Sequence, residues 1–79
     1  MRSEPSVSEL RSRVAANVRQ LRGVAGLTQD QLAERANLAT RHVQKLEAGS
    51  VNATFKTVAA LAKALDVDAS LLLAPRNAG

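Results

Sequence analysis

The 79-residue chain contains no cysteine, no tryptophan, no tyrosine and a single phenylalanine, Phe55. Without cysteine it can form no disulfide bond, no thiolate-ligated metal site and no thiol nucleophile. With one aromatic side chain it lacks the stacking platform on which proteins commonly hold single-stranded nucleic acid. A nucleic-acid partner, if there is one, is therefore expected to be a duplex.

Long apolar runs and catalytic patterns are also missing. No stretch reaches the ~20 consecutive apolar residues of a membrane-spanning helix, and residues 1–9 lack the apolar centre of a signal peptide, so we expect a cytoplasmic protein without a membrane partner. The sequence shows no Gly-rich phosphate loop, no Ser/His/Asp arrangement and no paired carboxylates at catalytic spacing. We therefore expect neither enzymatic activity nor a cofactor. The lone histidine, His42, belongs to no cluster of potential ligands, so no metal site is expected.

An acidic excess is absent as well, because 11 Lys and Arg residues face 7 Asp and Glu residues, a net charge of +4. This modest basic excess permits nucleic-acid binding without requiring it. The length allows one domain. A domain of this size buries only roughly 60–65% of its unfolded surface, so a partner subunit would add stability.

The apolar residues that are present recur at spacings of three and four and never alternate with period two. This pattern predicts an all-α fold without strands. Helices are expected over residues 7–25, 28–36, 39–47, 55–65 and a short segment between 68 and 75, in a domain of residues 6–74 with tails at 1–5 and 75–79. The predicted helix caps are Ser6, Thr28, Thr54 and Asp68, and the predicted stops are Gly26, Asn37, Gly49, Asp66 and Pro75.

Two of these helices have a predicted inward face that consists of apolar residues. The apolar stripe of the first helix is Val7, Leu10, Val14, Val18, Leu21 and Ala25. The apolar face of the fourth is Phe55, Val58, Ala59, Leu61, Ala62 and Leu65, and we expect Phe55 to lie in the core.

Residues 28–47 combine two short helices with a turn of only a few residues, which is the helix-turn-helix arrangement. The small residues Ala33 and Ala36 allow the helices to cross closely, and Asn37 tolerates the left-handed conformation of a tight turn. The inward anchors would be Leu32, Val43 and Leu46. The outward face of the second helix carries the polar residues Thr40, Arg41, Gln44 and Lys45, which suits insertion into the major groove.

The segments "LTQDQLA", "VQKLEAG" and "TVAALAKALDVDASLLL" stand in the order and spacing of a known family. With them the chain resembles the phage-repressor/Cro-type (XRE-like) helix-turn-helix regulators from about Val14 to Leu73. The resemblance implies a compact five-helix, lambda-repressor-like DNA-binding domain. It also implies sequence-specific binding of double-stranded DNA.

The resemblance assigns roles to individual residues. Base contacts would come from Thr40, Arg41 and Lys45, with Gln44 a weaker candidate. Phosphate contacts would come from Arg19, Thr28, Gln29, His42, Asn52, Thr54 and Lys56. Gln29 would also brace the recognition helix. An ion pair between Arg22 and Glu47 would tie the first helix to the third.

The chain departs from the family pattern at two informative positions. Ala39 stands where a Ser or Thr usually caps the recognition helix, so we expect capping to shift to Thr40, away from base reading. Ala53 replaces a common proline before the fourth helix, so the preceding loop is expected to be looser.

Family members usually bind palindromes as two-fold dimers, with half-sites one helical turn, roughly 34 Å, apart. Three consecutive leucines near the C-terminus cannot all face one core from a two-turn helix. We therefore expect a homodimer through the fourth and fifth helices, with its interface at Leu71, Leu72 and Leu73.

Other interpretations of the same residues stay open. Arg41 and Lys45 could form a solvated helix face, and Arg19 could serve solubility alone. As a whole, the protein could be a phage-type repressor or restriction–modification controller acting with RNA polymerase, or an antitoxin whose main partner is a toxin. A helical bundle with vestigial DNA binding is a third hypothesis.

Overall fold

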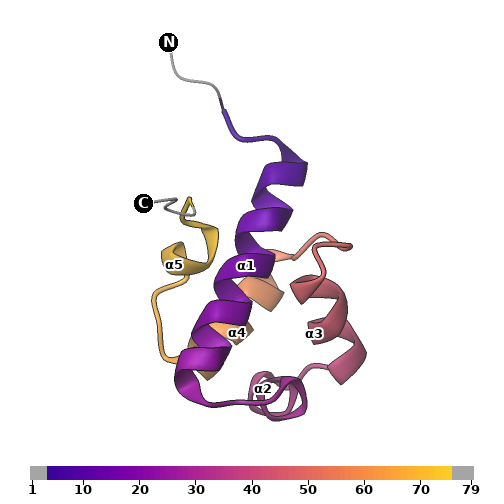
Figure 1. Cartoon of the computed structure of the whole chain (residues 1–79), viewed down its shortest axis with the longest axis vertical. Coiled ribbons are helices and arrows are strands. Elements are labelled where there is room, and N and C mark those ends of the chain that lie inside the picture. The colour runs from indigo at the N-terminus through magenta and orange to yellow at the C-terminus, as the bar shows by residue number, and fades with distance from the viewer. Residues whose placement is uncertain (1–3, 76–79) are drawn as a thin grey trace.

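A computed structural model of the chain describes residues 4–75, which form helices and no strands. The helices are α1 (Val7–Ala25), α2 (Gln29–Ala36), α3 (Thr40–Glu47), α4 (Phe55–Leu65) and α5 (Ser70–Leu73) (Figure 1). The predicted all-α, five-helix architecture is confirmed.

Three helices begin where a side-chain oxygen accepts a backbone N–H, at Ser6, Thr28 and Thr54 as the sequence predicts. At α2 the cap is reciprocal, because the Thr28 hydroxyl accepts from Gln31 N (3.0 Å) while the Gln31 side chain accepts from Thr28 N (2.9 Å). At α5 the N-cap is Ala69, without a side-chain cap, so the predicted cap at Asp68 is wrong. The Asp68 carboxylate lies just before the helix and accepts from Ser70 N at 2.8 Å. Hydrogen bonds from the Ser70 side chain and backbone lower the pKa of the Asp68 carboxyl.

A left-handed residue follows each of the first four helices, directly after α1, α2 and α4 and one residue beyond the C-cap Ala48 of α3. Gly26 and Gly49 have φ of 72°, and Asn37 and Asp66 have φ of 57°. Each is followed by a backbone N–H that reaches back five residues, as in Leu38 N to Ala33 O at 2.8 Å, so carbonyls of the last turn are satisfied. These compact ends keep the connections short, including the turn between α2 and α3.

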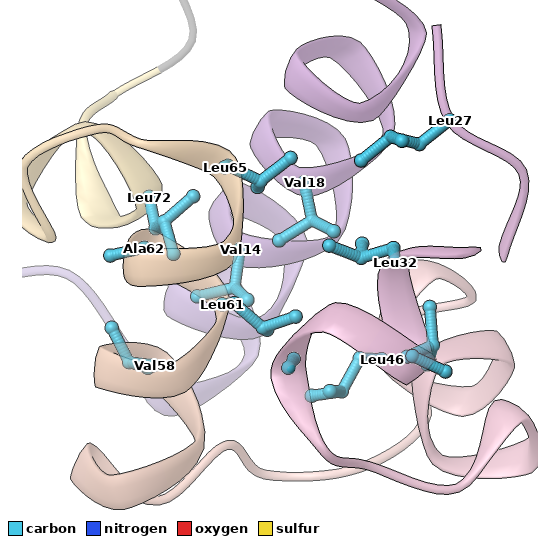
Figure 2. Packing of buried hydrophobic residues seen from close by; sticks show 13 residues of the cluster. Val14, Val18, Leu27, Leu32, Leu46, Val58, Leu61, Ala62, Leu65 and Leu72 are labelled. Atoms are coloured by element: carbon cyan, nitrogen blue, oxygen red, sulfur yellow. The ribbon is translucent and has the colours of Figure 1, made fainter. Parts of the chain in front are cut away.

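The core lies between α1 and the group formed by α2, α3 and α4. Its fully buried side chains are Val18, Leu32, Val43, Leu46, Leu61 and Leu72. Figure 2 shows residues of α1, α2, α3 and α4 converging on this centre. In Figure 1, α3 and α5 lie on opposite sides of α1, so a surface formed by α5 leaves α3 uncovered.

The ends of the predicted apolar faces extend beyond this core. Phe55 is 89% exposed, so its expected place in the core is wrong. Val7, Ala25 and Ala59 are exposed as well. Val7 and Phe55 begin their helices, and both line an apolar surface groove instead of the core. Ala59 is exposed although Val58 beside it is buried, so the buried face of α4 is narrower than predicted.

The fifth helix is held by one buried leucine and one buried amide. Leu72 is completely buried, so its predicted place in a dimer interface is wrong. Asn17 Nδ2 donates to the carbonyls of Leu72 and Ala74, both at 3.0 Å, which satisfies the end of α5. Leu71 is 49% exposed, and Leu73 is half-buried. Only these two of the three leucines are accessible to a partner.

Candidate nucleic-acid interface

The turn between α2 and α3 fixes the direction in which α3 points. Ala33 and Ala36 are buried where the helices meet, and Asn37 makes the left-handed turn between them. Val43 and Leu46 anchor the inner side of α3 with 0% and 2% exposure. The opposite side of the helix is therefore held outward.

That outward side carries the residues expected to read bases. Arg41, Gln44 and Lys45 are exposed, while Thr40 and His42 are half-buried. An amphipathic helix anchored in this way can offer its polar face to a groove without losing contact with the body.

A buried carboxylate fastens the C-terminal end of α3. Glu47 is 3% exposed and accepts from Arg22 Nε (2.6 Å) and a terminal guanidinium nitrogen of Arg22 (3.0 Å). Gln29 Nε2 donates to the same carboxylate at 3.0 Å, and Arg22 also donates to Leu27 O at 2.9 Å. The hydrogen bonds from Arg22 to Glu47 raise the pKa of the Arg22 guanidinium. The ion pair thus joins α1 to α3, and Gln29 adds a link from α2.

Arg19 lies at this same end of α3, where its guanidinium donates to the backbone carbonyl of Glu47. A cation at a helix C-terminus interacts favourably with the helix dipole. The contact gives Arg19 a structural role in addition to the phosphate contact that the resemblance implies.

The first turn of α3 differs from the expectation. Ala39 is the N-cap, and no side chain caps the helix, so the predicted shift of the cap to Thr40 is wrong. Thr40 is the first helical residue, with ordinary helical hydrogen bonds starting at its neighbour Ala39. Its hydroxyl is therefore not committed to capping and stays a candidate for DNA contact.

The loop between α3 and α4 lies beside the exposed face of α3. A shallow hollow is lined by Ala39, Arg41, His42, Lys45, Val51 and Asn52. The fold thus brings the predicted base-reading cations next to Asn52, a predicted phosphate contact. Val51 and Ala53 pack against the core, so this loop is anchored on both sides of Asn52.

Two predicted phosphate contacts are occupied as caps. Thr54 Oγ1 accepts from Thr57 N at 3.1 Å and lies 3.0 Å from Thr57 Oγ1. Thr28 Oγ1 accepts from Gln31 N. The hydroxyls of both residues are therefore used within the protein. What each residue offers to a phosphate is the start of its helix, whose backbone N–H groups attract anions.

The exposed charged side chains of α3 and of the start of α4 are all basic. Residues 35–65 hold the basic residues Arg35, Arg41, Lys45, Lys56 and Lys63 and a single acidic one, Glu47. Glu47 is buried against Arg22, so its charge is neutralised. The exposed surface of this segment is consequently basic.

Arg11 is a functional candidate to which the sequence assigned no role. Its Nε donates to Asn52 Oδ1 at 2.5 Å across 41 residues of sequence. The sequence signal is weak, because nothing in the spacing of Arg11 on α1 shows which loop lies beside it.

The described residues offer little for other kinds of site. Within residues 4–75 no three His, Cys, Asp or Glu side chains gather as a metal ion would need. Over the same residues no helix combines the length and apolarity needed to cross a membrane.

The close pairing of α2 and α3, the anchored inner side of α3 and its basic outer side define a helix-turn-helix domain. A model of the helix-turn-helix family HTH_3 matches residues 18–72. The chain belongs to this family of DNA-binding regulators. Comparison with curated protein sequences gave no match.

Several solved structures are similar to the chain. The restriction-modification controller protein C.AhdI from Aeromonas hydrophila has a TM-score of 0.76 at 31% identity, over 78% of this chain and 94% of that one. The hypothetical transcription factor NHTF from Neisseria has a TM-score of 0.83 at 31% identity, over 95% and 86%. The restriction-modification controller C.Esp1396I has a TM-score of 0.74 at 30% identity, over 80% and 81%. It has also been solved as a tetramer in complex with its natural 35-base-pair operator.

Proposed function

We propose that the chain is a sequence-specific transcription regulator that binds a palindromic operator in duplex DNA as a homodimer, of the restriction–modification-controller or phage-repressor type. The observation that carries this proposal is the unpaired basic surface of α3 and the start of α4. Arg41 and Lys45 are exposed beside Asn52, whereas the acidic group in the segment is buried against Arg22. Such a surface suits a polyanion of regular shape.

The position of the cations within their helices supports a functional role over a merely solvated face. The first turns of α1 and α2 contain Glu9 and Asp30, as helix dipoles favour. The first turns of α3 and α4 contain no acidic residue. Arg41 and Lys56 stand there instead, at the positive end of each dipole. A bound phosphate would relieve this unfavourable placement.

Within the complex the residues would divide into base readers and backbone contacts. Arg41 can donate two parallel hydrogen bonds to guanine O6 and N7, and Lys45 can reach the same atoms less selectively. Lys56 would neutralise a phosphate at the start of α4. The side-chain amide of Gln29 donates one N–H to Glu47 and has a second N–H that could donate to a phosphate.

The replacement of Arg41 by alanine is expected to relax the preference at one base pair per half-site, by about 1–3 kcal/mol. Binding titrations against single-base operator variants measure this. The operator comes from selecting bound sequences in a random duplex library, which also shows whether they are palindromic. The matched control is Lys56→Ala, which should weaken binding to all sequences alike and reduce the slope of log K against log salt by about 0.9. An unchanged preference in Arg41→Ala would contradict the base-reading role.

A dimer would double the number of base contacts, and the accessible surface of α5 is a suitable interface. Leu71 is exposed and Leu73 half-buried, and α5 lies across α1 from α3 (Figure 1). A partner bound there leaves both recognition helices free. The tetramer of C.Esp1396I on its operator supports assembly on DNA as a property of similar proteins.

Introducing a charge at Leu71 is expected to abolish the dimer, because burying an unpaired carboxylate in an apolar contact is strongly unfavourable. Sedimentation of Leu71→Asp should show a monomer at tens of micromolar. Val24→Asp is the control, since Val24 is 81% exposed at the other end of α1. A wild-type protein that remains monomeric at this concentration, both alone and on DNA, would remove the dimer from the proposal.

A further inference from the structure

Asn52 is oriented by a partner that only donates hydrogen bonds. Arg11 Nε donates to Asn52 Oδ1 at 2.5 Å. A guanidinium has no acceptor atom, so the carboxamide must turn its oxygen toward Arg11. Its NH₂ group, with two donors, is thereby directed away from Arg11. The contact thus determines which end of this amide is offered to the outside.

The amide is presented on the basic side of the molecule. Asn52 is exposed and shares the hollow with Arg41 and Lys45. The loop around it is fastened by the partly buried Val51 and Ala53. A side chain held in one orientation before binding loses less conformational freedom when a ligand arrives. An NH₂ group fixed among cations is suited to a phosphate oxygen.

Two arginines of α1, Arg11 and Arg13, differ in whether a carboxylate pairs with them. Arg13 pairs with Glu9 at 2.6 Å and also donates to Leu73 O, on the side of α5. Arg11 is half-buried, and among the described residues its guanidinium is in no ion pair. Its contact is instead a neutral amide of the loop that follows α3. Arg11 therefore contacts the loop after α3, whereas Arg13 contacts α5.

We propose that Arg11 is a positioning residue for DNA binding, which holds the Asn52 amide so that its NH₂ donates to a backbone phosphate. The inference rests on the proposed function, because it names how that surface is prepared for a duplex. The phosphate carries no sequence information. The effect should consequently be the same on operator and non-operator DNA.

A double-mutant cycle tests the coupling between the two residues. Arg11→Ala and Asn52→Ala should each lower duplex affinity roughly three- to tenfold, a range typical of the net contribution of one hydrogen bond. The double variant should be no weaker than the weaker single variant, since Arg11 acts through Asn52. Affinities are measured on the selected operator and on a scrambled duplex, and urea unfolding of each variant reports whether it is folded.

The salt dependence separates positioning from direct contact. If Arg11 only positions a neutral amide, Arg11→Ala keeps the wild-type slope of log K against log salt, whereas loss of a direct phosphate contact lowers it by about 0.9. Asn52→Asp retains the Arg11 contact but turns a carboxylate toward the DNA. It should therefore lose more duplex affinity than Asn52→Ala, while its urea unfolding curve stays like that of the wild type. Arg13→Ala is the control, with no coupling to Asn52.

The outcomes distinguish the inference from the function on which it rests. A wild-type protein that binds no duplex at low salt overturns the proposed function. Two results with a wild type that does bind would overturn only the positioning role of Arg11. One is that the affinity losses of Arg11→Ala and Asn52→Ala multiply in the double variant. The other is that Arg11→Ala lowers the slope of log K against log salt by about 0.9, the value for one phosphate contact.

Discussion

Alanine in place of Glu47 is expected to destabilise the fold by about 3 kcal/mol, the lower end of the range for breaking a buried ion pair. The carboxylate is 3% exposed and holds both Arg22 and Gln29. Its removal leaves a guanidinium and an amide without their main partner. The Arg22 side chain is 22% exposed, so water can solvate part of it, which places the cost at the low end.

This loss is large for a chain of 79 residues. At 0.05–0.15 kcal/mol per residue, the whole stability of such a domain is about 4–12 kcal/mol. Because Glu47 also holds the end of α3, the variant should lose DNA affinity even under conditions where most molecules stay folded. Urea unfolding gives the stability, and titration with duplex DNA gives the affinity.

The second ion pair of the described residues supplies a matched control. Glu9 and Arg13 also lie 2.6 Å apart, but the Glu9 side chain is 54% exposed. Glu9→Ala should therefore cost no more than about 1 kcal/mol, the usual limit for a surface pair. Equal losses in the two variants would mean that the buried pair contributes nothing beyond an ordinary surface contact.

The order and type of the helices follow from local signals that the sequence contains. Thr28 with Gln31, and Asn37 at the turn, act on the backbone within a few residues, so their effect does not depend on the rest of the fold. The same is true of Thr54, whose hydroxyl caps α4 by accepting from Thr57 N. These elements could be predicted because each is decided by its neighbours in sequence.

The errors arise where a distant part of the chain decides the outcome. Phe55 has the right helical spacing to be buried with Val58, yet its own side chain is left 89% exposed. Ala39 lacks a hydroxyl, and capping did not shift to Thr40, because the turn after Asn37 fixes where α3 begins. Helical period tells which residues share a face, but not how far the opposite layer extends.

The candidate site shows the same division. The outward position of Arg41 follows from the spacing of its inward anchors, which is local. The contact between Arg11 and Asn52 spans 41 residues, and only the folded arrangement brings the two together. Sequence reasoning therefore finds the exposed groups of the candidate site more readily than the residues that orient them.

Leu72→Ala should cost about 2–5 kcal/mol, the range for truncating a buried leucine, because its side chain is fully buried in the hydrophobic core. Leu71→Ala, one residue away and 49% exposed, should change the stability of the monomer by no more than about 0.5 kcal/mol. Figure 2 shows Leu72 directed toward the core beside Ala62.

The dependence on protein concentration separates the two leucines. A core contact contributes equally at every concentration, whereas a contact between subunits stabilises more as the concentration rises. Urea midpoints of Leu72→Ala should therefore lie below those of the wild type throughout a dilution series. Those of Leu71→Ala should approach the wild type at low concentration and fall behind it at high concentration. A concentration-dependent loss in Leu72→Ala, with none in Leu71→Ala, would return Leu72 to the subunit interface and show that α5 packs differently in the dimer.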